Sequence, residues 1–119
     1  MKLVSWNCQR LGGNQNIEVV KRIKSMESNS ILLIQETKNT TEDIFSIMKK
    51  VWRKGEGKAI SATGASGGIL TWWDEDKFSM CSAIESRNWL FLELVDKENK
   101  EVLWVGNIEL DFLNMTTSS

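Results

Sequence analysis

The sequence contains no histidine, no proline and no tyrosine among its 119 residues. Without histidine the chain cannot form a Ser-His-Asp or Cys-His nucleophilic site, nor a zinc site that needs a histidine ligand. It also lacks the side chain that most often transfers protons near neutral pH. These absences exclude the commonest nucleophilic and acid–base sites.

Cysteine is scarce as well. The two cysteines, Cys8 and Cys81, are far apart in the sequence and form no CxxC motif. A disulfide framework or a metal knuckle is therefore not expected, and we predict two reduced, partly buried thiols.

The chain also lacks long apolar runs and an excess of charge of one sign. Its start does not resemble a signal peptide, and no run approaches the length of a membrane span. We therefore predict an intracellular protein with no membrane partner. Fifteen basic and sixteen acidic residues give a net charge of -1, which indicates neither nucleic acid nor anionic lipid as a partner.

Hydrophobic patterns in the first half predict alternating strands and helices. Residues 2–7 and 31–34 are typical of strands, the second covered on both faces. Between them, apolar residues recur every third position from Ile17 to Met26, which predicts a helix capped by Asn14 or Asn16. A second helix is predicted from the capping box of Thr40 and Asp43 and from the apolar stripe Ile44, Ile47, Met48, Val51 and Trp52.

The residue patterns of the second half are typical of strands. They are predicted over residues 59–62, 68–73, 78–85, 89–96 and 102–109. The polar stretch 97–100 predicts a hairpin between the last two, and the strand over residues 89–96 is expected to be central. This order of elements predicts a layered α/β (α+β) fold.

Polar residues follow directly on the first two predicted strands. Asn7 ends the first strand, and Glu36 follows the second. If these strands are neighbours, both residues lie in the crevice at the carboxyl ends of strands, where α/β folds bind ligands. An amide oxygen and a carboxylate suit a hard cation such as Mg²⁺. On these residues alone, a turn former and a solvated charge remain the alternative.

Three motifs resemble one enzyme family. They are KLVSWNCQRLG (residues 2–12), ILLIQETK (31–38) and SGGILTWW (66–73), in that order. Together they resemble the apurinic-like endonuclease domains of plant LINE-type (non-LTR) retrotransposons, within the endonuclease/exonuclease/phosphatase superfamily. The resemblance covers residues 1–108 but only about half of that family's domain. It implies the N-terminal half of the superfamily's four-layer sandwich.

The resemblance assigns roles to two residues, and two basic residues lie beside them. Asn7 and Glu36 match the positions that bind Mg²⁺ and orient the site, and so are the candidate catalytic and metal-binding residues. Arg10 and Lys38 lie beside them and are candidates to contact a DNA phosphate, with plain surface placement as the alternative. The implied cofactor is Mg²⁺ and the implied partner is DNA. RNA, phosphoinositides and other phosphodiesters remain open as substrates.

The sequence also departs from the family. Glu109 stands roughly where the family has an active-site Tyr, and the family's later Asp-x-Asn and Asp-His pairs are missing. Asp111 and Asn114 do not match Asp-x-Asn, because their spacing is wrong by one residue. The resemblance therefore implies a truncated or degenerate endonuclease domain of retroelement origin, inactive alone.

We predict a partial domain over residues 1–111 and a frayed tail over residues 112–119. Loss of a second half would uncover the inner faces of strands and favour self-association or aggregation. The residues expected on those faces are Trp72, Leu90, Leu92, Leu94, Leu103 and Val105.

Two other readings of the sequence remain open. The first is a non-catalytic α/β module for protein interaction or single-stranded nucleic acid, with tryptophans that stack on bases. Trp6, Trp52, Trp72 and Trp104 are expected in the core, and Trp73 and Trp89 at the surface. The second is an unrelated α/β protein that matches the motifs by chance.

Overall fold

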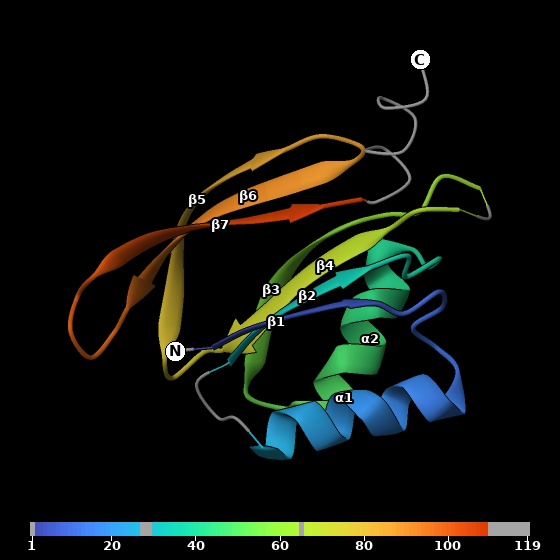
Figure 1. Ribbon diagram of the computed structural model, residues 1–119, viewed down its shortest axis with the longest axis horizontal. Coiled ribbons are helices and arrows are strands. Elements are labelled where there is room, and N and C mark those ends of the chain that lie inside the picture. The colour runs from blue at the N-terminus through green and yellow to red at the C-terminus, as the bar shows by residue number, and fades with distance from the viewer. Residues whose placement is uncertain (1, 27–29, 65, 110–119) are drawn as a thin grey trace.

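The computed structural model describes residues 2–26, 30–64 and 66–109, which form three layers. Helices lie against one face of a four-stranded sheet, and a three-stranded sheet packs on its other face (Figure 1). In chain order the elements are β1 (Lys2–Asn7), α1 (Asn14–Met26), β2 (Ser30–Gln35), α2 (Thr41–Val51), β3 (Gly55–Ile60), β4 (Ile69–Asp74), β5 (Phe78–Glu85), β6 (Trp89–Asp96) and β7 (Val102–Ile108). The predicted layered α/β fold is confirmed. The predicted tail, 112–119, and residues 110–111 of the predicted domain lie outside the described residues.

The first sheet has the strand order β1-β2-β4-β3. β1 and β2 are parallel, whereas β4 is antiparallel to both of its neighbours. β2 is buried on both faces, as its unbroken apolar sequence predicts. Leu32 and Ile34 belong to the core under the helices, while Ile31 and Leu33 belong to the core between the two sheets.

The second helix begins as the sequence predicts. The Thr40 side chain accepts a hydrogen bond of 3.2 Å from the Asp43 backbone N–H, which satisfies one of the free donors of the first turn. Ile44 and Met48 are fully buried on the side that faces the sheet. The predicted capping box and apolar stripe therefore place α2 correctly.

The first helix starts earlier than its apolar pattern indicates. It begins at Asn14, because the Gly13 carbonyl already accepts a helical hydrogen bond from Ile17 N. Asn16 is thus inside the helix and is not its cap. Its side-chain amide instead donates to the carbonyls of Cys8, at 3.1 Å, and Arg10. Asn16 therefore holds the loop that follows β1.

The second sheet has the order β5-β6-β7 and is antiparallel, with β6 central as predicted. The expectation that its inner face would be uncovered is wrong. Leu90, Leu92 and Leu94 are fully buried, and Val105 is 3% exposed, because this sheet lies over the first one. Trp72 is also fully buried, in the core under the helices. In the described part of the chain, the face without a covering element is the outer face of this sheet (Figure 1).

Two tryptophan predictions are wrong for a related reason. Trp73 was expected at the surface but is fully buried, because β4 is covered on both faces. Trp104 was expected in the core but is 55% exposed, because it alternates with the inward-facing Val105 on a strand covered on one face. Trp52 is buried as predicted, and Trp6 and Trp89 are half-buried.

The third strand begins four residues before the predicted start, at Gly55 instead of Ala59. Glycines usually weaken a strand, and the predicted strand therefore began only after Gly55 and Gly57. A Cβ on Gly55 or Gly57 would collide with the Trp72 ring. The strand tolerates glycine here because the large side chain of its neighbouring strand fills the space.

Candidate functional site

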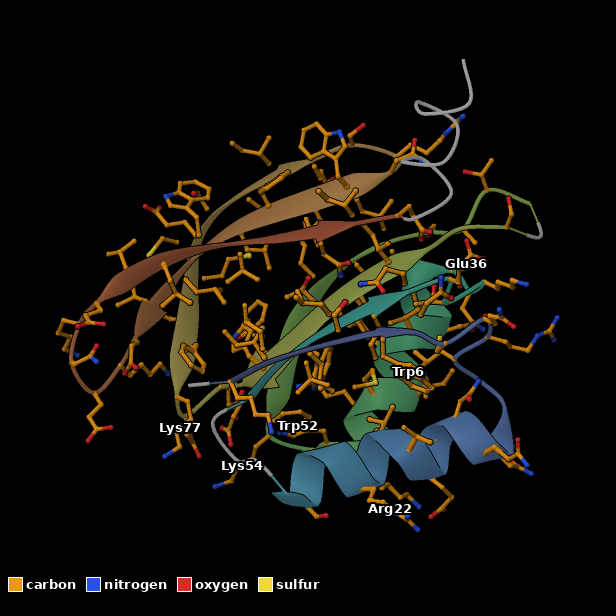
Figure 2. The ribbon with its side chains drawn as sticks, in the orientation of Figure 1. Trp6, Arg22, Glu36, Trp52, Lys54 and Lys77 are labelled. Carbon is orange, nitrogen blue, oxygen red and sulfur yellow. The ribbon has the colours of Figure 1, made fainter. Side chains whose placement is uncertain are left out.

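The parallel pairing of β1 and β2 sets the geometry of the candidate site. Asn7 lies opposite Gln35, one residue before Glu36, and Cys8 N donates to Gln35 O at 3.0 Å. Figure 1 shows the arrowheads of β1 and β2 on the same side of the molecule, and Figure 2 shows Glu36 on that side. The predicted proximity of Asn7 and Glu36 is confirmed, whereas their catalytic role stays a prediction.

The backbone beyond these strands adopts an unusual conformation. Gln9, Glu36 and Lys38 have φ angles of 60°, 57° and 57°, in the left-handed region that non-glycine residues rarely occupy. Such backbone conformations cost about 1–2 kcal/mol per residue and cluster at functional sites. The concentration of three of them after β1 and β2 marks this edge as a candidate functional site.

Hydrogen bonds join the segments that carry the three sequence motifs. Leu11 N donates to Thr37 O at 3.0 Å, which connects the segment after β1 to the segment after β2. Thr37 N and Lys38 N donate to the carbonyls of Gly68 and Gly67, at 3.0 and 2.9 Å. The Ser-Gly-Gly motif is therefore a backbone support for the Glu36 segment.

Glu109 is a site residue that sequence reasoning missed. It follows β7 directly and is 1% exposed, and its Oε1 accepts a hydrogen bond of 3.2 Å from the Glu36 backbone N–H. Figure 1 shows that β7 runs toward the same side as β1 and β2. The sequence offered a clue to this position. Side chains two residues apart lie on the same face of a strand, so Glu109 lies on the face of the apolar Leu103 and Val105, which is the core face.

A buried polar network behind the site ties the two sheets together. The Asn107 side chain accepts a hydrogen bond of 2.8 Å from Gln35 Nε2. Its own amide donates to Leu70 O at 2.9 Å and to Thr71 Oγ1 at 3.2 Å. Asn107 therefore links β7 to β2 and β4. It fixes the strand that carries Glu109 against the strand that ends at Glu36.

The Cys8 thiol is part of the same buried region. Its Sγ donates to Glu36 O at 3.6 Å, and burial raises the pKa of the Cys8 thiol above its ordinary value. The negative charges of Glu36 and Glu109 add to that rise, against the lowering effect of backbone hydrogen bonds. Both cysteines are free thiols as predicted, but Cys81 is exposed, not partly buried.

Asn7 and Glu36 have the chemistry of a magnesium site. Asn7 Oδ1 is buried and receives no hydrogen bond from any described residue. Glu36 is 8% exposed and adds a carboxylate at the same edge. Oxygen donors of these two kinds are what Mg²⁺ prefers, with water completing its shell. Within the described ranges, no group of three or more His, Cys, Asp or Glu side chains is placed to hold a metal.

The two basic candidates lie on the rim of this site. Arg10 is exposed and Lys38 is half-buried, each in a loop that follows one of the paired strands. Their contact with a DNA phosphate stays a prediction.

Comparison with known proteins gives a consistent picture of the fold. No protein-family model matches the sequence, and a search of curated proteins gives no match. Solved structures do match. The AP endonuclease LMAP from Leishmania major has a TM-score of 0.66 at 14% identity, over 89% of this chain and 39% of that one. The chain thus has the fold of endonuclease/exonuclease/phosphatase proteins.

Two further structures agree. The endonuclease/exonuclease/phosphatase from Bacteroides vulgatus has a TM-score of 0.64 at 11% identity, over 88% of this chain and 50% of that one. The D. rerio TDP2, complexed with a single-strand DNA product, has a TM-score of 0.61 at 12% identity, over 98% and 52%. The chain therefore spans about two fifths to half of the structures it matches. None of the helices described here is long and apolar enough to cross a membrane.

Proposed function

We propose that this chain forms the part of a magnesium-dependent phosphodiester hydrolase domain that carries Asn7 and Glu36. The observation that carries the proposal is the parallel pairing of β1 and β2, which sets both residues at one sheet edge. Asn7 would offer its amide oxygen and Glu36 its carboxylate to Mg²⁺. The cation, when bound, polarises a phosphoryl oxygen and stabilises the charge that develops there during attack.

The proposed substrate is DNA, and the proposed origin is a retroelement endonuclease. The support is the sequence of the SWNC and QETK motifs, together with the likeness of fold to an AP endonuclease. Arg10 and Lys38, at the rim, would meet a backbone phosphate. If the gene derives from such an element, the nucleotide sequence downstream encodes Asp-x-Asn and Asp-His segments in some frame, and unrelated sequence there would contradict this origin.

We predict that the 119-residue chain does not hydrolyse DNA by itself. It holds no histidine or tyrosine, and general acid–base catalysis alone typically contributes ~10²–10⁴-fold in rate. The measurement is nicking of supercoiled and abasic plasmid with and without Mg²⁺, with the Glu36→Ala variant as control. Magnesium-dependent nicking that disappears in this variant would overturn the prediction of inactivity.

We also propose that the chain self-associates weakly through the outer face of β5, β6 and β7. An apolar groove of about 500 Å³ on this face is lined by Ile84, Trp89, Phe91 and Trp104. Ile84 and Trp104 are each 55% exposed, and the Phe91 ring packs over Gly106. A contiguous exposed apolar surface of this kind marks an interaction site.

The charge of this face favours protein over single-stranded nucleic acid. The outward positions of β6 and β7 include Trp89, Phe91 and Trp104, which could stack on bases. However, the one charged side chain among these described positions is Glu93, which is acidic. A nucleic-acid surface needs basic groups beside its aromatic side chains. We therefore retain the nucleic-acid-binding module only as the alternative function.

We predict that Trp104→Ser weakens self-association. The change removes the largest exposed apolar side chain of the groove without altering the inward face of β7. Sedimentation velocity over a range of concentrations should show a rising average for the parent chain and a concentration-independent monomer for the variant. Val19→Ser, at another exposed apolar position on α1, is the matched control and should behave like the parent. Equal self-association of all three chains would contradict the proposal.

A further inference from the structure

We infer that the edge of β7 is a docking site at which one extended segment of a separate polypeptide adds a fourth strand to the second sheet. This sheet has the order β5-β6-β7, and among the described strands none pairs with the outer side of β7. The edge runs along the strand and is distinct from the sheet end that carries Asn7 and Glu36, so strand addition requires no bound cation.

The backbone of β7 directs donors and acceptors to that outer side. In an antiparallel pair, successive residues point their N–H and C=O groups alternately toward the two sides of the strand. Glu109 N donates to Asn88 O beyond one end of the pair. Asp96 N donates to Glu101 O at the other end, and the register between them is unbroken. The odd-numbered residues of β7 therefore bond to β6. The outward groups belong to Val102, Trp104, Gly106 and Ile108.

β7 lacks the features that usually protect a sheet edge. Natural edge strands carry charged side chains, proline or a β-bulge, all of which hinder further pairing. The β7 sequence VLWVGNI contains no charged residue and no proline, and its pairing with β6 has no register shift. By contrast, β5 at the opposite edge has an irregularity between Met80 and Ser82. Gly106 has no side chain, so its exposure is that of the backbone itself.

The first sheet leaves room for a strand beside β7. β7 contacts β2 and β4, and the Lys58–Glu85 ion pair of 3.6 Å joins β3 to β5. The three strands of the second sheet thus lie over β2, β4 and β3, and β1 extends beyond them. Leu3 of β1 pairs with Ile31 on the face between the sheets, yet Leu3 is 49% exposed and Ile31 is fully buried. A strand added to β7 would lie over β1 and cover Leu3.

The position of β1 also decides which occupant fits. A second copy that paired its own β7 antiparallel with this one would be related by a two-fold axis through the sheet. Both first sheets would then lie on the same side, and they would overlap because each extends one strand beyond its β7. A single extended segment brings no second layer with it. The occupant is therefore one strand of a separate polypeptide, uncharged like β7, with apolar side chains at the alternate positions that face Leu3.

The experiment measures backbone amide exchange of the full chain by NMR, with and without an excess of a synthetic peptide. The peptide alternates valine and threonine and carries a lysine at each end for solubility. The N–H groups of Trp104, Gly106 and Ile108 should exchange ~10-fold or more slowly with the peptide present, because pairing protects them. Those of Leu103 and Val105, which already bond to β6, should not change.

Two substitutions at one exposed position test whether the backbone edge binds the peptide. Val102→Pro removes an outward N–H and leaves every N–H that bonds to β6, so the sheet is retained. Val102→Thr keeps the N–H and the β-branched shape. The proline variant should bind the peptide ~10-fold or more weakly than the threonine variant, since it loses a hydrogen bond and its ring obstructs the edge. Leu3→Ser should also weaken binding, because it removes the apolar surface that the added strand covers.

The outcomes separate strand addition from binding elsewhere. If the peptide does not slow exchange at the even-numbered positions of β7, the inference is overturned. Equal binding by the Val102→Pro and Val102→Thr chains would overturn it as well. A peptide that perturbs only Ile84 and Phe91 binds in the outer groove, which contradicts strand addition and leaves the proposed self-association standing.

Discussion

Replacing Asn107 by leucine is expected to lower the free energy of unfolding by about 3 kcal/mol, although leucine has nearly the same size. The Asn107 side chain is 1% exposed and accepts from Gln35 while it donates to Leu70 O and Thr71 Oγ1. Leucine would leave these groups buried without their partner, at about 1–3 kcal/mol for each group that finds no substitute. Urea unfolding followed by tryptophan fluorescence measures the change as a lower midpoint at unchanged slope.

A double-mutant cycle with Gln35 tests the physical reason for that loss. Gln35→Leu removes the partner from the other sheet, and the double variant replaces both polar side chains by apolar ones. Because a matched apolar pair leaves fewer unsatisfied groups, the double variant should be more stable than the sum of the single losses predicts, by roughly 1 kcal/mol or more. Strictly additive losses would show that the Gln35–Asn107 hydrogen bond does not couple the sheets.

The sequence predicts well those parts of the fold that depend on local patterns. The capping residue Thr40 and the apolar stripe of α2 act within one or two helical turns, so the helix is correctly placed. The unbroken apolar run of β2 indicates a strand covered on both faces, and it is. The approach of Asn7 and Glu36 also follows, because it requires only that two successive strands pair in parallel.

Exposure of individual tryptophans depends instead on which elements cover each face. Trp72 and Trp73 are adjacent on β4 and point to opposite faces, yet both are fully buried. One is under the helices and the other is between the sheets. Trp104 occupies an equally apolar stretch, but the described residues place no element over it. The local sequence pattern is equally apolar in β4 and β7, so only the tertiary arrangement decides which tryptophans are buried.

The contribution of β7 to the site is a long-range feature. Asn107 and Glu109 are more than 70 residues from their partners Gln35 and Glu36, so no window of sequence relates them. The sequence does show that they lie on the same face of the strand as Leu103 and Val105. A polar side chain on that core face must find a buried partner. Which partner it finds follows only from the packing of the second sheet on the first.

Gly68→Ala is expected to lower the free energy of unfolding by about 3 kcal/mol and to disturb the Glu36 segment. Gly68 has φ of 93°, and a Cβ there would collide with Thr37 Oγ1. Left-handed backbone costs about 1–2 kcal/mol for a residue with a Cβ, and overpacking adds about 1–3 kcal/mol. Because Gly68 O accepts the hydrogen bond from Thr37 N, the strain passes directly to the residue after Glu36.

Gly64→Ala separates the collision from the backbone strain. Gly64 also has positive φ, at 63°, but nothing lies within 4 Å of the position its Cβ would take. The expected loss is therefore the conformational part alone, about 1 kcal/mol. Urea unfolding should rank the chains in falling stability as parent, Gly64→Ala and Gly68→Ala. Only Gly68→Ala should also weaken the binding of Mg²⁺ at the proposed site. If the two alanine variants lose equal stability, the collision at Gly68 has no cost of its own. The contact between the Ser-Gly-Gly and Gln-Glu-Thr-Lys segments then does not support the site.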